Sequence, residues 1–134
     1  MELTTKQKTI KYWRDGAKKS LELAEFVLAK KHYDHSLFCG HLALEKLLKA
    51  KVIEKTNQPA PYSHDLLYLA GLVKIDLTKE QQKFLVEANE FNIAGRYFEQ
   101  KLEFHRKITK SIAQKKLAQI KESYLWLSKL KEKN

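Results

Sequence analysis

Apolar residues recur every three to four positions through the first part of the chain. Between residues 4 and 30 they form a stripe of six side chains: Ile10, Trp13, Ala17, Leu21, Ala24 and Leu28. This spacing places them on one side of a helix, so we predict a first helix over residues 4–30. The motif KKHYD interrupts the pattern, and Asp34 is the predicted N-cap of a second helix over residues 35–55.

A proline-containing loop separates this pair of helices from the rest of the chain. The segment TNQPAPYS contains both prolines and cannot continue a helix. Ser63 is the predicted cap of a short third helix over residues 64–74. Thr78 and Gln81 have the spacing of a capping box, which predicts a fourth helix from residue 78 to about residue 97. The weaker stretch FEQKLEF follows it.

The last part of the chain has the two-sided pattern of a helix that lies on a surface. Over residues 105–130, one side carries Ile108, Ile112, Ala113, Leu117, Ile120, Tyr124, Leu127 and Leu130, and the other carries Lys107, Lys110, Lys121 and Lys129. No run alternates between apolar and polar residues as strands do. The sequence therefore predicts an all-α fold. We expect one domain over residues 1–134, an antiparallel up-and-down bundle of four long helices plus one short helix.

The composition narrows the class of protein. No apolar run approaches the about 18 residues of a membrane span, and the amino terminus has no apolar run of a secretory signal. The single cysteine, Cys39, excludes an internal disulfide and a multi-thiolate zinc site. The five histidines are scattered, so we expect neither a metal nor a cofactor. These features predict a cytoplasmic protein with no membrane partner.

The chain is strongly basic, with a net charge of +10 and a pI near 9.6. Much of the excess lies after residue 100, where ten basic residues accompany three acidic ones. A basic surface favours phosphates, nucleotides or RNA as partners. Lysine-rich helices are also common for solubility alone, and the composition does not separate these two explanations.

The stretch HLALEKLLKA places three ionisable groups in one row of a helix. His41, Glu45 and Lys49 are one turn apart, and the row lies among leucines. A buried carboxylate without a partner costs several kcal/mol or shifts its pKa, and both bases are close enough to pair with it. We therefore predict that Glu45 meets basic groups in a sheltered groove. Alternatively, the row is a polar pair that fixes helix register, or part of a subunit interface.

The stretch NEFNIAGRYF provides a second group of candidate residues. Asn92 and Arg96 lie one turn apart beside an apolar stripe, and an arginine facing a cleft binds anions strongly. Alternatively, Arg96 pairs with Glu45 or Glu99. His64 lies at a helix N-terminus, where free N–H groups attract anions. The candidate nucleotide- or phosphate-binding residues are Arg96, Lys49, Asn92, His41, Glu45 and His64.

The order and spacing of these segments resemble the HEPN domain, whose name stands for higher eukaryotes and prokaryotes nucleotide-binding. KSLELAEFVLAKKHYDHSLFCGHLALEKLLKAKVIEK resembles its first two helices, with Glu45 and Lys49 one turn apart. SHDLL resembles the His-x-Leu pair that opens the third helix, and Arg96-Tyr97 the pair that closes the fourth. The resemblance extends from about residue 12 to residue 130. It implies a compact helical bundle that is usually a homodimer.

The resemblance implies two different kinds of function. Many members act as the helical partner of a minimal nucleotidyltransferase, often in toxin–antitoxin modules. Our leading expectation is such a nucleotide-binding and interaction module. Another branch consists of metal-independent ribonucleases, in which a histidine follows an arginine by four to six residues and two copies form the site.

The spacing of the ribonuclease branch is not matched in this chain. Eight residues lie between Arg96 and His105, and Phe98 follows the Arg-Tyr pair where the non-nuclease branch more often has proline. The alternatives to the leading expectation are an endoribonuclease that uses Arg96 and His105 at a dimer interface, with RNA as a partner, and a purely structural dimerisation bundle.

Overall fold

Six α-helices make up the part of the chain that the computed structural model describes, residues 2–130. Three are long, namely α1 (Thr5–Ala29), α2 (Tyr33–Thr56) and α6 (Lys110–Lys129), and three are shorter, namely α3 (Leu66–Val73), α4 (Lys79–Asn89) and α5 (Phe98–Lys107). The predicted all-α class is confirmed. The predicted set of four long helices and one short helix was wrong in detail, because the described residues form three of each.

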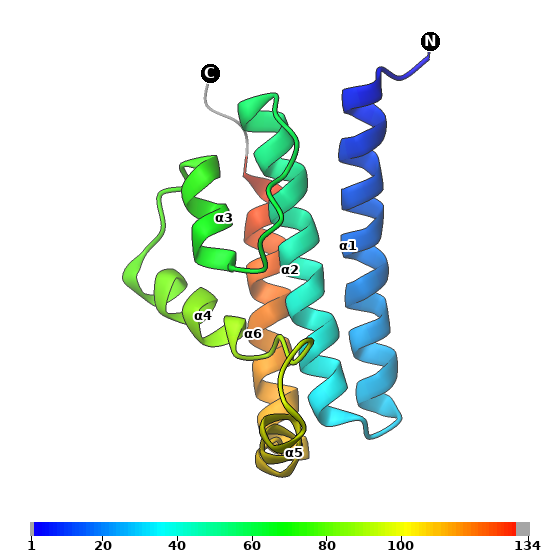
Figure 1. Ribbon diagram of the computed structural model, residues 1–134, viewed down its shortest axis with the longest axis vertical. Helices are drawn as coiled ribbons and strands as arrows, with labels where there is room; N and C mark the ends of the chain where they lie inside the picture. The colour runs from blue at the N-terminus through cyan, green and yellow to red at the C-terminus, as the bar shows by residue number, and fades with distance from the viewer. Residues whose placement is uncertain (1, 131–134) are drawn as a thin grey trace.

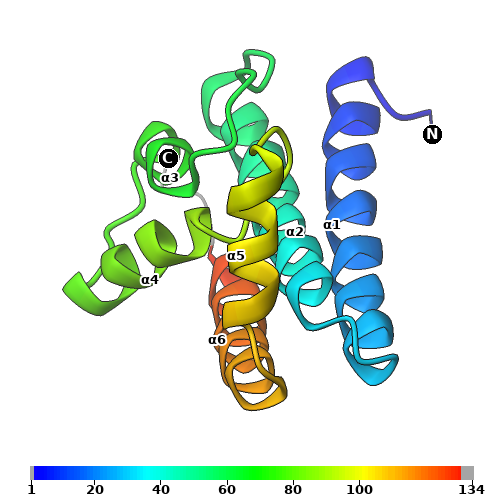
Figure 2. The same ribbon diagram turned by 60° about the horizontal axis from the view of Figure 1, so that its bottom comes forward.

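The three long helices lie side by side along the length of the molecule (Figure 1). α2 lies between α1 and the group formed by α3 and α4, and α6 runs in the same direction as α2. This direction is possible because α3, α4 and α5 return the chain to the end at which α2 begins. Figure 2 shows α5 in front of α2 at that end.

α2 is the central helix because it is apolar or small on almost every side. Leu37, Leu44 and Leu48 are fully buried. On the side toward α6, Gly40 takes the place of a larger residue: a Cβ atom there would lie 2.6 Å from Cδ1 of Ile120. A helix that is buried all round has no wet side, so polar residues within it need partners inside the protein.

Two helices begin as the sequence predicts. The hydroxyl of Thr4 accepts a hydrogen bond from the backbone N–H of Gln7 at 3.1 Å, and the Gln7 side chain caps the N–H of Thr4. The same reciprocal pair joins Thr78 and Gln81 at the start of α4, at 3.0 Å and 2.9 Å. Both capping boxes satisfy backbone donors that the first turn of a helix leaves without partners.

Two predicted caps were wrong. Asp65 rather than Ser63 caps α3, since its carboxylate accepts from two backbone N–H groups of the first turn, at 3.0 Å and 3.2 Å. Asp34 lies inside the first turn of α2 and its side chain is buried, so it does not cap that helix. Instead, the carboxylate of Asp34 accepts a hydrogen bond from His105, which lies far away in the sequence.

The segment between α4 and α6 also differs from the prediction. α4 ends at Asn89 rather than near residue 97, and Gly95 has a φ of +78°, which interrupts any helix. The stretch FEQKLEF, whose pattern predicts only a weak segment, is the start of α5. Thr109 caps α6 by accepting from the N–H of Ile112, so His105 belongs to α5 and not to the last helix.

Candidate functional site

The three ionisable groups of α2 lie inside the bundle. His41 is fully buried, and Glu45 and Lys49 are 4% and 5% exposed. The ammonium of Lys49 donates to Oε2 of Glu45 at 3.1 Å, and Nδ1 of His41 lies 3.9 Å from Oε1. Glu45 therefore meets basic groups in a sheltered place, as the row of polar residues predicts.

His64 completes the set of partners around Glu45. Its Nδ1 donates to Oε1 of Glu45 at 2.8 Å, and its backbone carbonyl accepts from Nε2 of His41 at 3.0 Å. The loop before α3 is thus attached to α2 through both a side chain and the backbone. Sequence reasoning placed His64 at an anion site and missed this pair, because the two residues are far apart in the sequence.

The network continues from α3 into the end of α4. The amide of Asn89 donates to the carboxylate of Asp65 at 3.0 Å, and its oxygen accepts from the N–H of Leu66 at 2.9 Å. The ammonium of Lys49 also lies 5.2 Å from the centroid of the Trp13 ring, which adds a cation–π contact with α1. We call the set His41, Glu45, Lys49, His64, Asp65 and Asn89 the polar network.

The polar network joins α2, the loop before α3 and the end of α4. Its three residues on α2 are buried, whereas the side chain of His64 is 48% exposed. This geometry matches the alternative in which the polar row fixes how the helices pack. Burial lowers the pKa of His41, and the charge of Glu45 only partly opposes this effect. His41 is therefore neutral at pH 7. Its Nε2 carries the proton that is donated to His64, and Nδ1 has no hydrogen-bond partner among residues 2–130.

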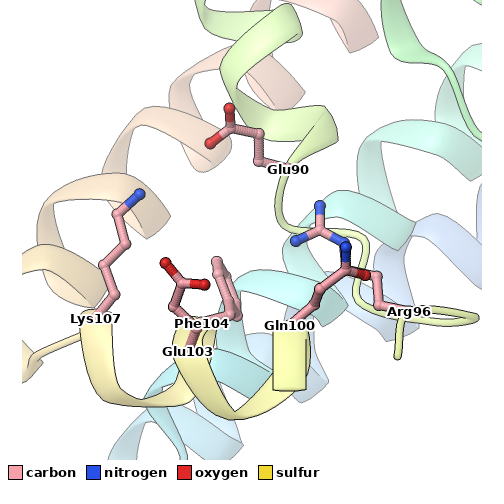
Figure 3. Close-up of a pocket in the computed structure, with 6 residues that line it drawn as sticks. All are labelled: Glu90, Arg96, Gln100, Glu103, Phe104 and Lys107. Carbon is pink, nitrogen blue, oxygen red and sulfur yellow. The ribbon is translucent and has the colours of Figure 1, made fainter. Parts of the chain in front are cut away.

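Arg96 lies apart from the polar network, in the connection between α4 and α5. It lines an open hollow of about 450 Å³ whose other lining residues are Glu90, Gln100, Glu103, Phe104 and Lys107. We call this the Arg96 hollow. Figure 3 shows the side chains of Arg96 and Lys107 on opposite sides of it, with Glu103 and Phe104 between them.

The guanidinium of Arg96 packs on an aromatic ring, and the residue is half-buried. The guanidinium carbon lies 6.0 Å from the centroid of Phe104. Within the described residues Arg96 forms no ion pair, so neither Glu45 nor Glu99 is its partner. The planar donors of the guanidinium are therefore available to an anion that enters the hollow.

The chemistry of the Arg96 hollow is mixed. Arg96 and Lys107 supply two positive charges, and Glu90 and Glu103 supply two negative ones. The side-chain oxygen of Gln100 caps the start of α5, which leaves its amide nitrogen as a donor. A ligand with both a phosphate and hydroxyl or amino donors suits this set better than a bare polyanion does.

The turn that carries Arg96 is held by its own residues. The side-chain oxygen of Asn92 accepts from the N–H of Ala94 at 3.3 Å, and Gly95 adopts the left-handed conformation just before Arg96. Asn92 does not line the hollow. The structure places it as a support for the turn.

His105 does not line the Arg96 hollow. Its Nδ1 donates to Oδ2 of Asp34 at 3.1 Å, and its side chain is 67% exposed. Nδ1 of His35 lies 3.3 Å from the other oxygen of Asp34. Burial raises the pKa of Asp34, but the hydrogen bond from His105 and the charge of His35 more than offset this, so the pKa is lowered overall. Arg96 and His105 of one copy therefore do not share the Arg96 hollow.

Residues 2–130 contain neither a metal-binding cluster nor a membrane-spanning helix. No group of three or more His, Cys, Asp or Glu side chains in this range is arranged to hold a metal ion. Every helix in this part of the chain is too short or too polar to cross a membrane.

Comparisons with known proteins agree with this architecture. Residues 10–130 match the family model described as HEPN domain. The crystal structure of TT1696 from Thermus thermophilus is similar, with a TM-score of 0.75 and 17% sequence identity over 89% of this chain and 95% of that chain. At this identity the likeness shows a shared fold. No curated protein matches the sequence significantly.

Proposed function

We propose that this chain, which belongs to the HEPN domain family, is a nucleotide-binding module in which Arg96 holds a phosphate. The observation that carries the proposal is the half-buried Arg96, which lines a hollow and has no ion pair within residues 2–130. A charged group that is partly removed from water is stabilised by an opposite charge. A phosphate in the Arg96 hollow supplies that charge.

The lining residues favour a nucleotide over inorganic phosphate. The phosphate binds the planar fork of Arg96, and Lys107, on the opposite side of the hollow, adds a second positive charge. Glu90 and Glu103 accept hydrogen bonds from ribose hydroxyls or base amino groups. The free face of the guanidinium offers a plane on which a base stacks.

The other predicted binding residues support this site indirectly in our proposal. Asn89 ties the end of α4 to the start of α3, and Glu45 holds that start on α2 through His64. Asn92 shapes the turn that follows α4. Lys49 stabilises the buried carboxylate of Glu45 through its ion pair, and the neutral His41 donates to the backbone carbonyl of His64. Together these contacts fix the position from which Arg96 enters the hollow.

The proposal includes the partners that family membership suggests. The module acts as a homodimer and as the helical partner of a minimal nucleotidyltransferase, in a cytoplasmic two-component system of the toxin–antitoxin kind. Exposed apolar side chains on α1, Leu23 at 50% and Phe26 at 60%, support a protein contact on that helix. Light scattering of the pure protein, and co-purification with the product of a neighbouring gene, test these two partners separately.

A calorimetric titration with the four ribonucleoside triphosphates tests the binding role. Hydrogen bonds to charged groups contribute about 1.5–3 kcal/mol, so Arg96→Ala is expected to weaken binding by about 10-fold or more. Arg106→Ala is the matched control, because Arg106 is an exposed arginine of α5 that does not line the hollow. Absence of binding to the wild type, or equal binding by Arg96→Ala, contradicts the proposal.

A second candidate function is metal-independent cleavage of RNA, and the contact between His105 and Asp34 favours it. A buried carboxylate that accepts from Nδ1 orients the imidazole and leaves Nε2 facing solvent as a general base. Nε2 then removes the proton of a 2′-hydroxyl, whose oxygen attacks the adjacent phosphate to form a 2′,3′-cyclic phosphate. The bond to the 5′-oxygen breaks, and this oxygen leaves as a hydroxyl after taking a proton from water. In this scheme Arg96 of a second copy stabilises the phosphate, because His105 does not line the Arg96 hollow of its own copy.

Incubation of a mixed RNA with the protein in EDTA tests the ribonuclease function. Cleavage is expected to be lost in His105→Ala and reduced in Asp34→Asn. His32→Ala is the matched control, because His32 is an exposed histidine that forms no ion pair with Asp34 within the described residues. Absence of cleavage by the wild type, or cleavage that survives in His105→Ala, removes this candidate.

A further inference from the structure

A second hollow lies between α1 and α2, which run side by side in Figure 1. It measures about 260 Å³ and is lined by Tyr12, Trp13, Asp15, Gly16, Lys19 and Lys46. We call it the Tyr12 hollow. It shares no lining residue with the Arg96 hollow, so a ligand here makes a separate set of contacts.

Lys46 forms part of this hollow and has no carboxylate partner within residues 2–130. It is half-buried, and its ammonium donates to the hydroxyl of Ser20 at 2.9 Å. A single neutral hydroxyl uses one of the three donors of an ammonium. Because a partly buried cation is stabilised by an opposite charge, Lys46 favours an anionic ligand.

Gly16 explains how Lys46 comes to lie there. Glycine is unfavourable in the interior of a helix, and Gly16 lies well inside α1. A Cβ atom at Gly16 would lie 3.3 Å from Cδ of Lys46. Because Gly16 has no side chain, the methylene groups of Lys46 pack directly against α1 at this position. The ammonium of Lys46 thereby reaches the hollow.

Two aromatic rings form the other side of the Tyr12 hollow. The ring of Tyr12 is 70% exposed and lies edge to face with Trp13, at 5.5 Å between centroids. The Trp13 ring also makes a cation–π contact with the ammonium of the buried Lys49. Trp13 is thus supported from within, and Tyr12 is open to a planar group from solvent.

The geometry points to a nucleotide-unit site in the Tyr12 hollow, with a base stacked on Tyr12 and a phosphate bound by Lys46 and Lys19. Base stacking on aromatic side chains combined with lysine contacts to the backbone is how proteins hold single-stranded RNA. Asp15 opposes this charge little, since Lys11 pairs with it at 2.6 Å. At about 260 Å³ the hollow is smaller than the roughly 300–1,000 Å³ of pockets that bury most of a ligand, so it covers part of one nucleotide unit and leaves the rest exposed.

A second copy of the chain fits this surface less well than a nucleotide does. A twofold contact centred on the hollow would bring Lys19 and Lys46 of one copy toward the same residues of the other. Like charges that face each other across an interface are unfavourable. The same lysines are favourable next to a phosphate.

The fluorescence of Trp13 provides a direct test. The chain has two tryptophans, so Trp126→Phe leaves Trp13 as the one emitter. This protein is titrated at low salt with uridine monophosphate and, separately, with a short single-stranded polyuridylate. We expect quenching of Trp13 emission. Quenching by both probes identifies the free nucleotide as a ligand, and quenching by the strand alone identifies RNA.

Substitutions in the same background test the assigned roles. Tyr12→Ala is expected to weaken binding roughly 5- to 100-fold, the effect of losing one stacked base. Lys46→Gln is expected to weaken binding and to reduce the slope of log affinity against log salt by about 0.7, the value for one phosphate contact. The controls are Tyr68→Ala, an exposed tyrosine on α3, and Lys83→Gln on α4, which should bind as the parent does.

Two outcomes overturn the inference. One is absence of Trp13 quenching by either probe, and the other is unchanged affinity in both Tyr12→Ala and Lys46→Gln. Arg96→Ala separates this site from the Arg96 hollow, because quenching of Trp13 should persist in that variant. If Arg96→Ala abolishes all binding while Tyr12→Ala has no effect, the Arg96 proposal stands and this one fails.

Discussion

The imidazole of His64 donates a hydrogen bond of 2.8 Å to the buried carboxylate of Glu45, and this contact attaches the loop before α3 to the middle of α2. The same carboxylate accepts from Lys49 at 3.1 Å. A carboxylate with these partners has its charge balanced inside the bundle. Substitutions at Glu45 should therefore lower the stability of the fold. They should change ligand affinity only as far as they disturb the fold.

Replacing Glu45 with glutamine should lower the free energy of unfolding by about 3–5 kcal/mol, since Lys49 would remain buried without its counter-charge. Urea denaturation followed by circular dichroism measures this change. Glu25→Gln is the matched control, because Glu25 pairs with Lys121 at a half-exposed position and such pairs contribute about 0–1 kcal/mol. Similar midpoints for the two variants would show that the polar network does not stabilise the fold.

The buried His41 should make stability depend on pH. Burial lowers its pKa below the ordinary value of 6.5, so below pH 6.5 the unfolded chain binds a proton that the folded chain does not. The free energy of unfolding is then at its full value above pH 6.5. It decreases as the pH falls toward the folded pKa, by up to about 1.4 kcal/mol per pH unit. Glu45, His64 and Asn89 are the groups that face this ring, and all three remain in the variant His41→Gln.

His41→Gln should flatten the decrease in stability below pH 6.5, because it removes the group that titrates. His32→Gln, at an exposed histidine, should keep the wild-type slope. Urea midpoints measured at a series of pH values give both slopes. Parallel curves for His41→Gln and the wild type would rule out a role for His41 in the pH dependence.

Two glycines should respond in opposite directions to alanine. At Gly40 the new Cβ would lie 2.6 Å from Cδ1 of the buried Ile120, and overpacking typically costs about 1–3 kcal/mol. At Gly71, in α3, no other atom lies within 4 Å of the new Cβ, so alanine should stabilise by about 0.5–1 kcal/mol. Thermal unfolding of both variants gives the sign of each effect.

The close contact between α2 and α6 predicts how Gly40→Ala can be relieved. Adding Ile120→Val removes the methyl group nearest to the new Cβ, so the double variant should recover part of the lost stability. If Gly40→Ala is as stable as the wild type, then α6 adjusts its position and the contact does not restrict residue 40.

The sequence predicts where several helices begin, because residues close together in the sequence determine a helix start. Thr78 begins α4 through the capping box that its four-residue pattern predicts, and α1 begins within one residue of its predicted start. The apolar spacing does not show where α4 ends. Phe91 lies beyond the helix but is still buried, and Gly95 then turns the chain. An apolar stripe thus continues through a turn, and periodicity alone extends the helix too far.

The candidate sites show the same division between local and distant contacts. The pairing of Glu45 with Lys49 follows from a separation of one turn. His64 and Glu45, like His105 and Asp34, come together only when distant segments pack, so no sequence spacing reveals these pairs. The sequence predicts that Arg96 needs an anionic partner, and the fold places it at the hollow without an ion pair among residues 2–130.

The central claim is that Arg96 binds the phosphate of a nucleotide, and nuclear magnetic resonance tests it most directly. The side-chain Nε–Hε signal of Arg96, assigned by its loss in Arg96→Lys, is followed while ATP is added. We expect a saturable shift of this signal, with the signal of Arg106 unchanged. If ATP binds while the Arg96 signal does not shift, or if the signal does not shift at the highest ATP concentration, Arg96 does not bind the phosphate.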